Sequence, residues 1–88
     1  MIAKDFTISN RLGIHARPAA LFAKAASRFQ SDIRVIKDGL EINGKSIMGI
    51  MMLAAAQGNT ITIRADGADE EAAIRTLENL LENRFGEE

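Results

Sequence analysis

The residues best suited to chemistry gather around position 15, where the chain's only histidine, His15, stands three residues before its only proline, Pro18. If a helix begins at Ala16, the N–H groups of its first turn lack intrahelical partners and, with the helix dipole, attract an anion. The N–H groups of Ala16 and Arg17 would point into that region. The Arg17 guanidinium adds a positive charge and a planar set of donors that suits phosphate oxygens. The same field opposes protonation, which keeps one imidazole nitrogen nucleophilic. These residues suit a histidine that accepts a phosphoryl group and passes it on.

The same residues also allow a simpler interpretation. A single histidine ahead of a helix is most often a cap or loop residue, and Arg17 can be an ordinary solvated side chain. Other chemistries fit less well, because no serine or cysteine nucleophile is paired with His15 and neither a metal-ligand cluster nor a glycine-rich phosphate loop is present. The lack of cysteine excludes disulfides and thiolate chemistry, and one histidine speaks against structural zinc. From the residues alone, both roles for His15 stay open.

A second stretch, NGKSIMGIMML at 43–53, combines a helix cap with large apolar side chains. Ser46 is a good N-cap, and the simplest interpretation assigns the apolar residues to the core. These residues nearly encircle the helix, however, and a chain of 88 residues has no interior thick enough to bury every face. We therefore expect some of them to form an exposed, methionine-rich binding surface. The set comprises Ile47, Met48, Ile50, Met51, Met52 and Leu53.

Turn signals and hydrophobic periodicity predict the elements that position these residues. The expected order is β-α-β-β-α-β-α, an α+β layer with helices on one face of a mainly antiparallel four-stranded sheet. The strands are expected at 2–9, 31–37, 40–43 and 59–67, and the helices from 16 to about 29, from a cap at 46 to before 58, and at 69–85.

Local signals add detail to this outline. Pro18 fits a first helical turn and sets the helix start near 16, while Asp38-Gly39 is a strong hairpin signal. Leu21, Ala25 and Phe29 form a stripe at helical spacing, and Ile74, Leu77, Leu81 and Arg84 share a register in the last helix. Alanines at 16, 19 and 20 are expected to leave the approach to the histidine uncrowded. The core is expected to be dominated by Leu21, Phe22, Ile33, Leu53, Ile63 and Leu77.

Length and composition limit the possible functions. We expect one domain over residues 1–88. Eleven basic and twelve acidic residues give a net charge of −1, which lacks the electrostatic footprint of a nucleic-acid binder. Four phenylalanines as the only aromatics and the absence of a GXXG loop also disfavour an RNA-binding α+β domain. No apolar stretch reaches the roughly 18–20 residues needed to cross a bilayer, and the N-terminus lacks a secretory signal, so a cytoplasmic location is expected.

The segment NRLGIHARPAALFAKAASRF at 10–29 closely resembles the active-site signature of the HPr family, the histidine-containing phosphocarriers of the bacterial phosphoenolpyruvate:sugar phosphotransferase system. The chain length and the expected element order are similar as well, so the resemblance covers essentially the whole sequence. It implies an open-faced sandwich with three helices on one face of a four-stranded antiparallel sheet.

The resemblance also implies a relay. Enzyme I would pass phosphate from phosphoenolpyruvate to Nδ1 of His15, and the carrier would hand it to an EIIA domain of a sugar permease. Arg17 would stabilise the phosphoryl group, the Ala16 N–H would hold its oxygens, and Pro18 would fix the helix start. Such a chain is a stoichiometric carrier and not an enzyme, it uses neither cofactor nor metal, and it is expected to be a monomer.

The segment GKSIMGIM is similar to the one that HPr kinase/phosphorylase recognises, which implies ATP-dependent phosphorylation of Ser46 where that kinase is present. Ile47, Met48 and Met51 map onto the family's docking patch around the histidine. Met52 replaces a frequent serine, which enlarges the apolar surface. The alternative is an HPr-like regulatory module of a phosphotransferase branch not coupled to sugar transport. Regulatory relatives tend to lack the active histidine, which is present here.

Overall fold

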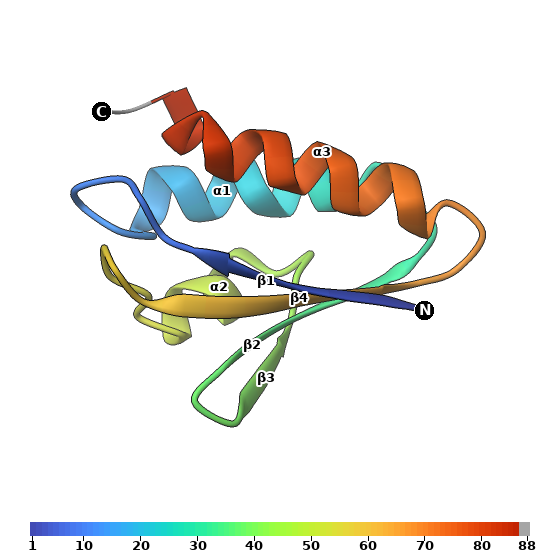
Figure 1. Ribbon diagram of the computed structural model, residues 1–88, viewed down its shortest axis with the longest axis horizontal. Helices are drawn as coiled ribbons and strands as arrows, with labels where there is room; N and C mark the ends of the chain where they lie inside the picture. The colour runs from blue at the N-terminus through green and yellow to red at the C-terminus, as the bar shows by residue number, and fades with distance from the viewer. Residues whose placement is uncertain (87–88) are drawn as a thin grey trace.

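The computed structural model describes residues 1–86, and its four strands form one antiparallel sheet (Figure 1). The strand order across the sheet is β1-β4-β2-β3, so β4 lies between the first two strands of the chain. The strands are β1 (Ile2–Thr7), β2 (Asp32–Lys37), β3 (Leu40–Asn43) and β4 (Thr60–Asp66), and the helices are α1 (Ala16–Ala26), α2 (Ile47–Met52) and α3 (Glu70–Glu82). A 3₁₀ turn, η1 (Arg84–Gly86), follows α3. The predicted order and architecture are confirmed.

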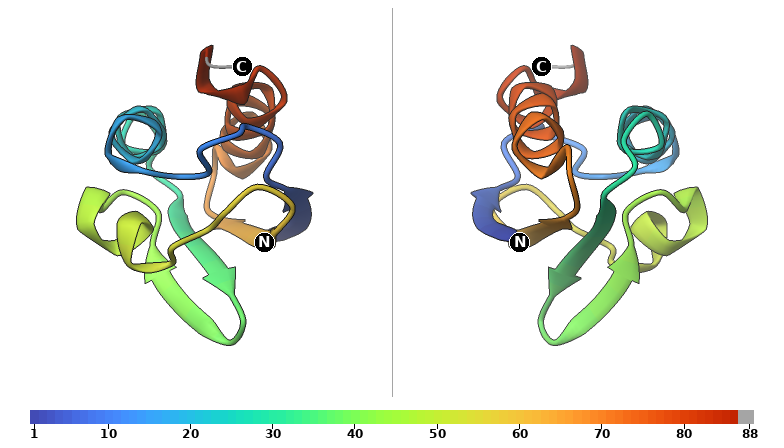
Figure 2. Two further views of the ribbon diagram at one scale, coloured as in Figure 1. Left: turned by 90° about the vertical axis from the view of Figure 1, so that its left-hand side faces the viewer. Right: turned by 90° about the vertical axis from the view of Figure 1, so that its right-hand side faces the viewer.

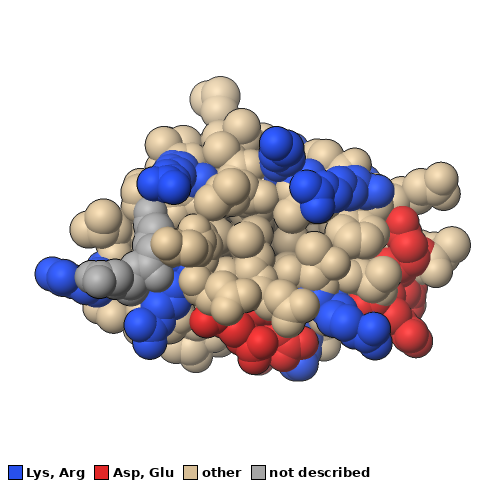
Figure 3. Space-filling view, turned by 90° about the horizontal axis from the view of Figure 1, so that it is seen from above, with Lys and Arg blue, Asp and Glu red and all other residues tan. Residues whose placement is uncertain are grey.

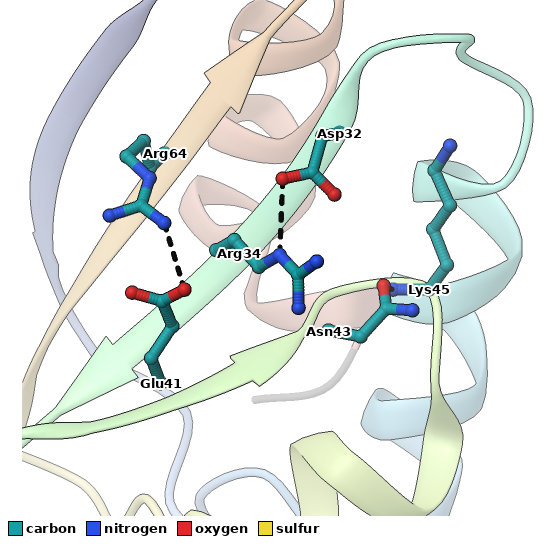
Figure 4. A network of polar contacts seen from close by, with 6 residues as sticks. All are labelled: Asp32, Arg34, Glu41, Asn43, Lys45 and Arg64. Atoms are coloured by element: carbon teal, nitrogen blue, oxygen red, sulfur yellow. Dashed lines mark hydrogen bonds and ion pairs between the residues drawn. The ribbon is translucent and has the colours of Figure 1, made fainter.

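The three helices cover one face of the sheet and leave the other open (Figures 1 and 2). Successive side chains of a strand point to opposite faces of the sheet, and those of the central strands are apolar on the face that the helices cover. Val35 of β2, for example, pairs with Ile63 of β4, and both side chains are buried. On the open face the neighbouring residues are charged. There, Arg64 contacts Glu41 at 2.8 Å and Arg34 contacts Asp32 at 3.1 Å (Figure 4). The hydrophobic core therefore lies between the sheet and the helices.

Phe22 is the large side chain with which α1 enters the core. It is buried together with Ala19, Ala23 and Ala26, which follow the spacing of one helical face. The predicted stripe through Leu21 is wrong, because Leu21 lies one residue, or about 100°, off that face and is 36% exposed. α1 also ends at Ala26 and not near Phe29, where the chain turns toward β2.

The turn between β2 and β3 is the Asp-Gly hairpin that the sequence predicts. Asp38 and Gly39 have φ values of 50° and 82°, and two successive left-handed residues match the right-handed twist of the flanking strands. Lys45, which follows β3 (Figure 4), donates a hydrogen bond from Nζ to the Phe29 carbonyl at 2.8 Å. This contact ties the start of α2 to the end of the α1 segment.

Like α1, helices α2 and α3 end before the limits that the sequence predicts. α2 stops at Met52 because Ala54 takes a left-handed φ of 50°, which turns the chain toward the loop before α1. α3 stops at Glu82, so Arg84 lies outside the helix, and Phe85 is buried from a left-handed conformation with φ 55°. Among the described residues, no helix is long and apolar enough to span a membrane.

Candidate functional site

His15 is the N-cap residue of α1 and has an extended backbone with φ −98° and ψ −164°. Its carbonyl accepts the first helical hydrogen bond, from the Ala19 N–H at 2.9 Å. The imidazole is half-buried, and its Nε2 atom has almost no accessible surface. Access to the imidazole through Nε2 is therefore limited.

Two backbone N–H groups open this helix. The Ala19 N–H donates a hydrogen bond to the His15 carbonyl, and Pro18 has no N–H group. The N–H groups of Ala16 and Arg17 therefore have no hydrogen-bond partner in residues 1–86. Both residues are exposed, and no acidic side chain occupies the first turn. The predicted anion-attracting helix start is therefore present beside His15.

Arg17 adds a permanent positive charge to this helix start. Its side chain is exposed and makes no ion pair with any residue from 1 to 86, so the guanidinium can turn toward a bound anion. Pro18 is buried in the first turn, as predicted from its fixed φ. Ala19 is fully buried in the core, so the expectation that it borders the approach to His15 is wrong, whereas Ala20 is half-buried.

The loop before His15 is held by the segment that follows α2. Ile8 exchanges two backbone hydrogen bonds with this segment, and Ile14 donates to the Ala55 carbonyl at 2.8 Å. The backbone approaches so closely that a Cβ on Gly13, whose φ is 68°, would lie 2.5 Å from the Ala55 oxygen. The buried Asn10 amide also donates to the Gly13 carbonyl. The fold therefore brings the two stretches that sequence analysis singled out to the same end of the molecule (Figure 2, left).

Ser46 caps α2, as predicted. Its Oγ accepts a hydrogen bond from the Gly49 N–H at 3.0 Å, and its carbonyl accepts one from Ile50. The side chain is half-buried. The hydroxyl thus lies at the start of the helix that carries the apolar side chains.

The apolar residues of α2 divide into a buried and an exposed set. Ile50 and Leu53 are buried in the core. The exposed set, named here the α2 patch, consists of Ile47 (46% exposed), Met48 (76%), Met51 (44%) and Met52 (67%). The prediction that some of these side chains must reach the surface is confirmed.

Two further leucines are exposed, and their exposure was not predicted. Leu12 is in the loop that leads to His15, and Leu21 follows on α1. The alternation of large and small residues in α1 holds a signal for Leu21, since centring the helix on Phe22 turns Leu21 outward. No sequence signal identifies Leu12 as exposed, because its exposure depends on the loop's contact with Ala55.

Charge is distributed unevenly around this site. Residues 6–31 include Arg11, Arg17, Lys24 and Arg28 and not one acidic residue. Seen from the helix side, basic side chains form a row along the edge of α1 that includes no acidic side chain, whereas acidic side chains lie at one end and, mixed with basic ones, at the opposite edge (Figure 3). Within residues 1–86, no three His, Cys, Asp or Glu side chains lie close enough together to hold a metal ion. The surface around His15 therefore favours an anionic group or an acidic protein surface.

Comparison with known proteins places this geometry in context. A family model described as "PTS HPr component phosphorylation site" matches residues 2–83. The phosphocarrier protein HPr of Xylella fastidiosa (strain Temecula1 / ATCC 700964) is 47% identical over 88 residues, which cover 100% of this chain and 99% of that protein.

Two solved structures from Thermoanaerobacter tengcongensis are also similar. The structure of HPr-C-His shares 52% identity and a TM-score of 0.96, with 100% of this chain and 99% of that chain covered. The structure of an HPr dimer shares 54% identity and a TM-score of 0.80, with 93% and 94% covered. The similarity thus extends over sequence and fold alike.

Proposed function

This chain belongs to the HPr family of phosphocarriers of the phosphotransferase system, and we propose that it carries the phosphoryl group on Nδ1 of His15. A member of this family is a stoichiometric carrier, phosphorylated by one protein and dephosphorylated by another, and not a catalyst. The family-model match and the full-length similarity support a single domain over residues 1–88.

The observation that carries the proposal is the position of His15 at the start of α1. The free N–H groups of Ala16 and Arg17 can hold phosphoryl oxygens, and the limited access to Nε2 favours attack through Nδ1. In the transfer step, the Nδ1 lone pair forms a bond to phosphorus as the bond between phosphorus and the donor's nitrogen breaks. Arg17 then offsets the charge on the transferred group.

The expected donor is Enzyme I, and the expected acceptors are EIIA domains. We place their contact surface on Ile47, Met48 and Met51, which are exposed on α2, the helix that lies at the same end of the molecule as the start of α1 (Figure 2, left). We further propose that the chain meets both partners as a monomer and in the cytoplasm. Transfer to a regulatory phosphotransferase branch instead of a sugar permease would use the same residues.

We assign a regulatory role to Ser46. Its hydroxyl lies next to the α2 patch, so ATP-dependent phosphorylation there would add close to two negative charges beside a surface that meets acidic partners. The helix start itself favours such an anion, and little change in fold is expected. Phosphoserine would therefore act by hindering docking of Enzyme I.

Phosphorylation by Enzyme I tests the proposal for His15. The protein is incubated with Enzyme I and phosphoenolpyruvate, and the phosphate formed should be labile in acid and stable in base. His15→Ala should abolish it while retaining the wild-type unfolding curve. NMR of the labelled imidazole should place phosphorus on Nδ1. A wild-type chain that stays unlabelled with several Enzymes I contradicts the carrier role, and phosphate on Nε2 contradicts the assigned atom.

A second labelling reaction tests Ser46. HPr kinase and ATP should produce an acid-stable phosphate that Ser46→Ala abolishes, with Ser27→Ala as the matched control because Ser27 also bonds a helix backbone group. The phosphorylated protein should accept phosphate from Enzyme I more slowly. Label that persists in Ser46→Ala shows that another residue is modified.

A further inference from the structure

The α2 patch has a chemical property that docking does not use, because three of its four side chains are thioethers. The chain contains four methionines and lacks cysteine, tryptophan and tyrosine, so methionine sulfur is its main target for a mild oxidant. Met48, Met51 and Met52 lie in the α2 patch, and the fourth methionine is Met1. Three of the four oxidisable sulfur atoms therefore lie in the α2 patch, and α2 lies at the same end of the molecule as the start of α1 (Figure 2, left).

These three methionines contribute little to holding the fold together. α2 is anchored to the core by Ile50 and Leu53, and its start is fixed by the Ser46 cap. Met48 and Met52 are each at least two-thirds exposed, and Met51 is nearly half exposed. Adding an oxygen to these side chains leaves the core unchanged, whereas the same change to a buried side chain would place an unpaired polar group in the interior.

We propose that Met48, Met51 and Met52 form an oxidation-sensitive site, at which hydrogen peroxide converts an apolar docking surface into a polar one. The inference rests on the proposed function, since it concerns docking beside His15. In the reaction the sulfur lone pair attacks one peroxide oxygen, and an S–O bond forms as the O–O bond breaks. Sulfur is oxidised by two electrons, and the departing hydroxide takes the proton of the transferred OH and leaves as water.

The consequence follows from the polarity of the sulfoxide. Its oxygen is a strong hydrogen-bond acceptor that must be desolvated when an apolar partner surface covers α2. Partner binding then weakens while the phosphoacceptor itself is untouched. Because sulfoxide can be reduced back by two reductases, one for each epimer, the loss is reversible.

The test compares phosphate transfer before and after mild treatment with hydrogen peroxide. Peptide mass mapping should find one added oxygen on each of Met48, Met51 and Met52. Transfer from phospho-Enzyme I should slow by about tenfold, the loss expected when a polar group is left unpaired in an apolar contact. The thermal unfolding midpoint should not change, and treatment with both reductases should restore the rate.

A matched variant separates methionine oxidation from other damage. In the triple variant Met48→Leu, Met51→Leu, Met52→Leu, leucine keeps the apolar volume and cannot be oxidised. Its rate after peroxide, divided by its own untreated rate, should stay near one. An equal loss in this variant, a failure of the reductases to restore the wild type, or a normal rate in fully oxidised wild type overturns the inference alone. An untreated chain that accepts no phosphate overturns the proposed function and this inference together.

Discussion

Among single residues, Arg17 has the clearest electrostatic part in the proposed transfer. Its guanidinium is exposed, unpaired among residues 1–86, and attached to the same helix start as His15. Arg17→Glu replaces an attraction to the phosphoryl group with a repulsion, so we expect transfer from phospho-Enzyme I to slow by at least about tenfold. Rapid-quench measurement of the phosphorylation rate checks this.

The control for Arg17 is Arg75→Glu, which makes the same change in net charge at an exposed position of α3. It should transfer phosphate at close to the wild-type rate. Equal rates for the Arg17 variant and the wild type would rule out an electrostatic role for that side chain.

Sequence predicts some of these residues better than others, for a physical reason. His15, Ala16, Arg17 and Pro18 are consecutive, so the start of one helix fixes how they lie relative to one another. The exposure of Leu12 is different, because it depends on a loop held by residues more than forty positions away. Local spacing contains no information about such a contact.

At the level of elements, the contact between the β1–α1 loop and the segment after α2 positions the site. Gly13→Ala brings a Cβ to 2.5 Å from the Ala55 oxygen and requires a left-handed alanine. We expect it to destabilise the fold by more than the roughly 1–2 kcal/mol of the backbone conformation alone, and to slow transfer through displacement of His15. Urea unfolding and the phosphorylation rate measure the two effects.

Gly39→Ala is the matched control for Gly13→Ala. Gly39 is also left-handed, with φ 82°, but a Cβ there meets nothing within 4 Å. It should cost only the backbone term and leave the transfer rate unchanged. If both variants lose the same stability and transfer phosphate equally well, close packing at Ala55 does not position His15.

A carboxylate links α3 to the loop that precedes β2. Asp69 accepts hydrogen bonds from the Ser31 hydroxyl and from the N–H groups of Gln30 and Ser31, the latter two at 2.8 and 2.9 Å. The Ser31 hydroxyl, and next the Gln30 N–H, lower the pKa of Asp69 below its ordinary value of 3.8. Since the folded pKa lies below the unfolded one, the stabilisation is complete above about pH 4 and is lost as the pH falls through the folded pKa.

Urea unfolding between about pH 6 and pH 2 checks the part played by Asp69. The free energy of unfolding should fall less steeply below pH 4 in Asp69→Asn than in the wild type. Asp38→Asn serves as the control, because its exposed carboxylate makes only a surface ion pair and asparagine suits its turn. A wild-type slope in Asp69→Asn would show that this carboxylate does not contribute to the acid sensitivity.

Sequence alone predicts some turns and helix ends of this fold and not others. The β2–β3 hairpin follows from Asp38-Gly39, because both residues take the left-handed conformations that this dipeptide favours. The end of α2 does not follow in the same way, since Ala54 has a left-handed φ that alanine does not favour by itself. The tertiary contact of Ala55 with Ile14 accompanies that turn.

At the scale of the whole molecule, the arrangement of charge matters more than its sum. The net charge is only −1, yet the chain has no acidic residue between Asp5 and Asp32 or between Glu41 and Asp66. These two segments supply His15, α1, α2 and the α2 patch. The molecule therefore presents a basic edge along α1, whereas the opposite edge of the helix face carries both acidic and basic side chains (Figure 3).

This polarity predicts that the encounter with an acidic partner depends on salt. Raising ionic strength from about 0.05 M to about 0.5 M shortens the screening length, so the second-order rate of phosphorylation by Enzyme I should fall several-fold. Lys24→Glu should flatten the dependence by removing an exposed charge of the α1 edge, whereas Arg75→Glu, with an equal change in net charge on α3, should keep more of the wild-type slope. Stopped-flow rates over a salt series measure this. If the rate depends on salt equally in the two variants, net charge and not the α1 edge attracts the partner. If the wild-type rate does not depend on salt, the α1 edge does not contribute to the encounter.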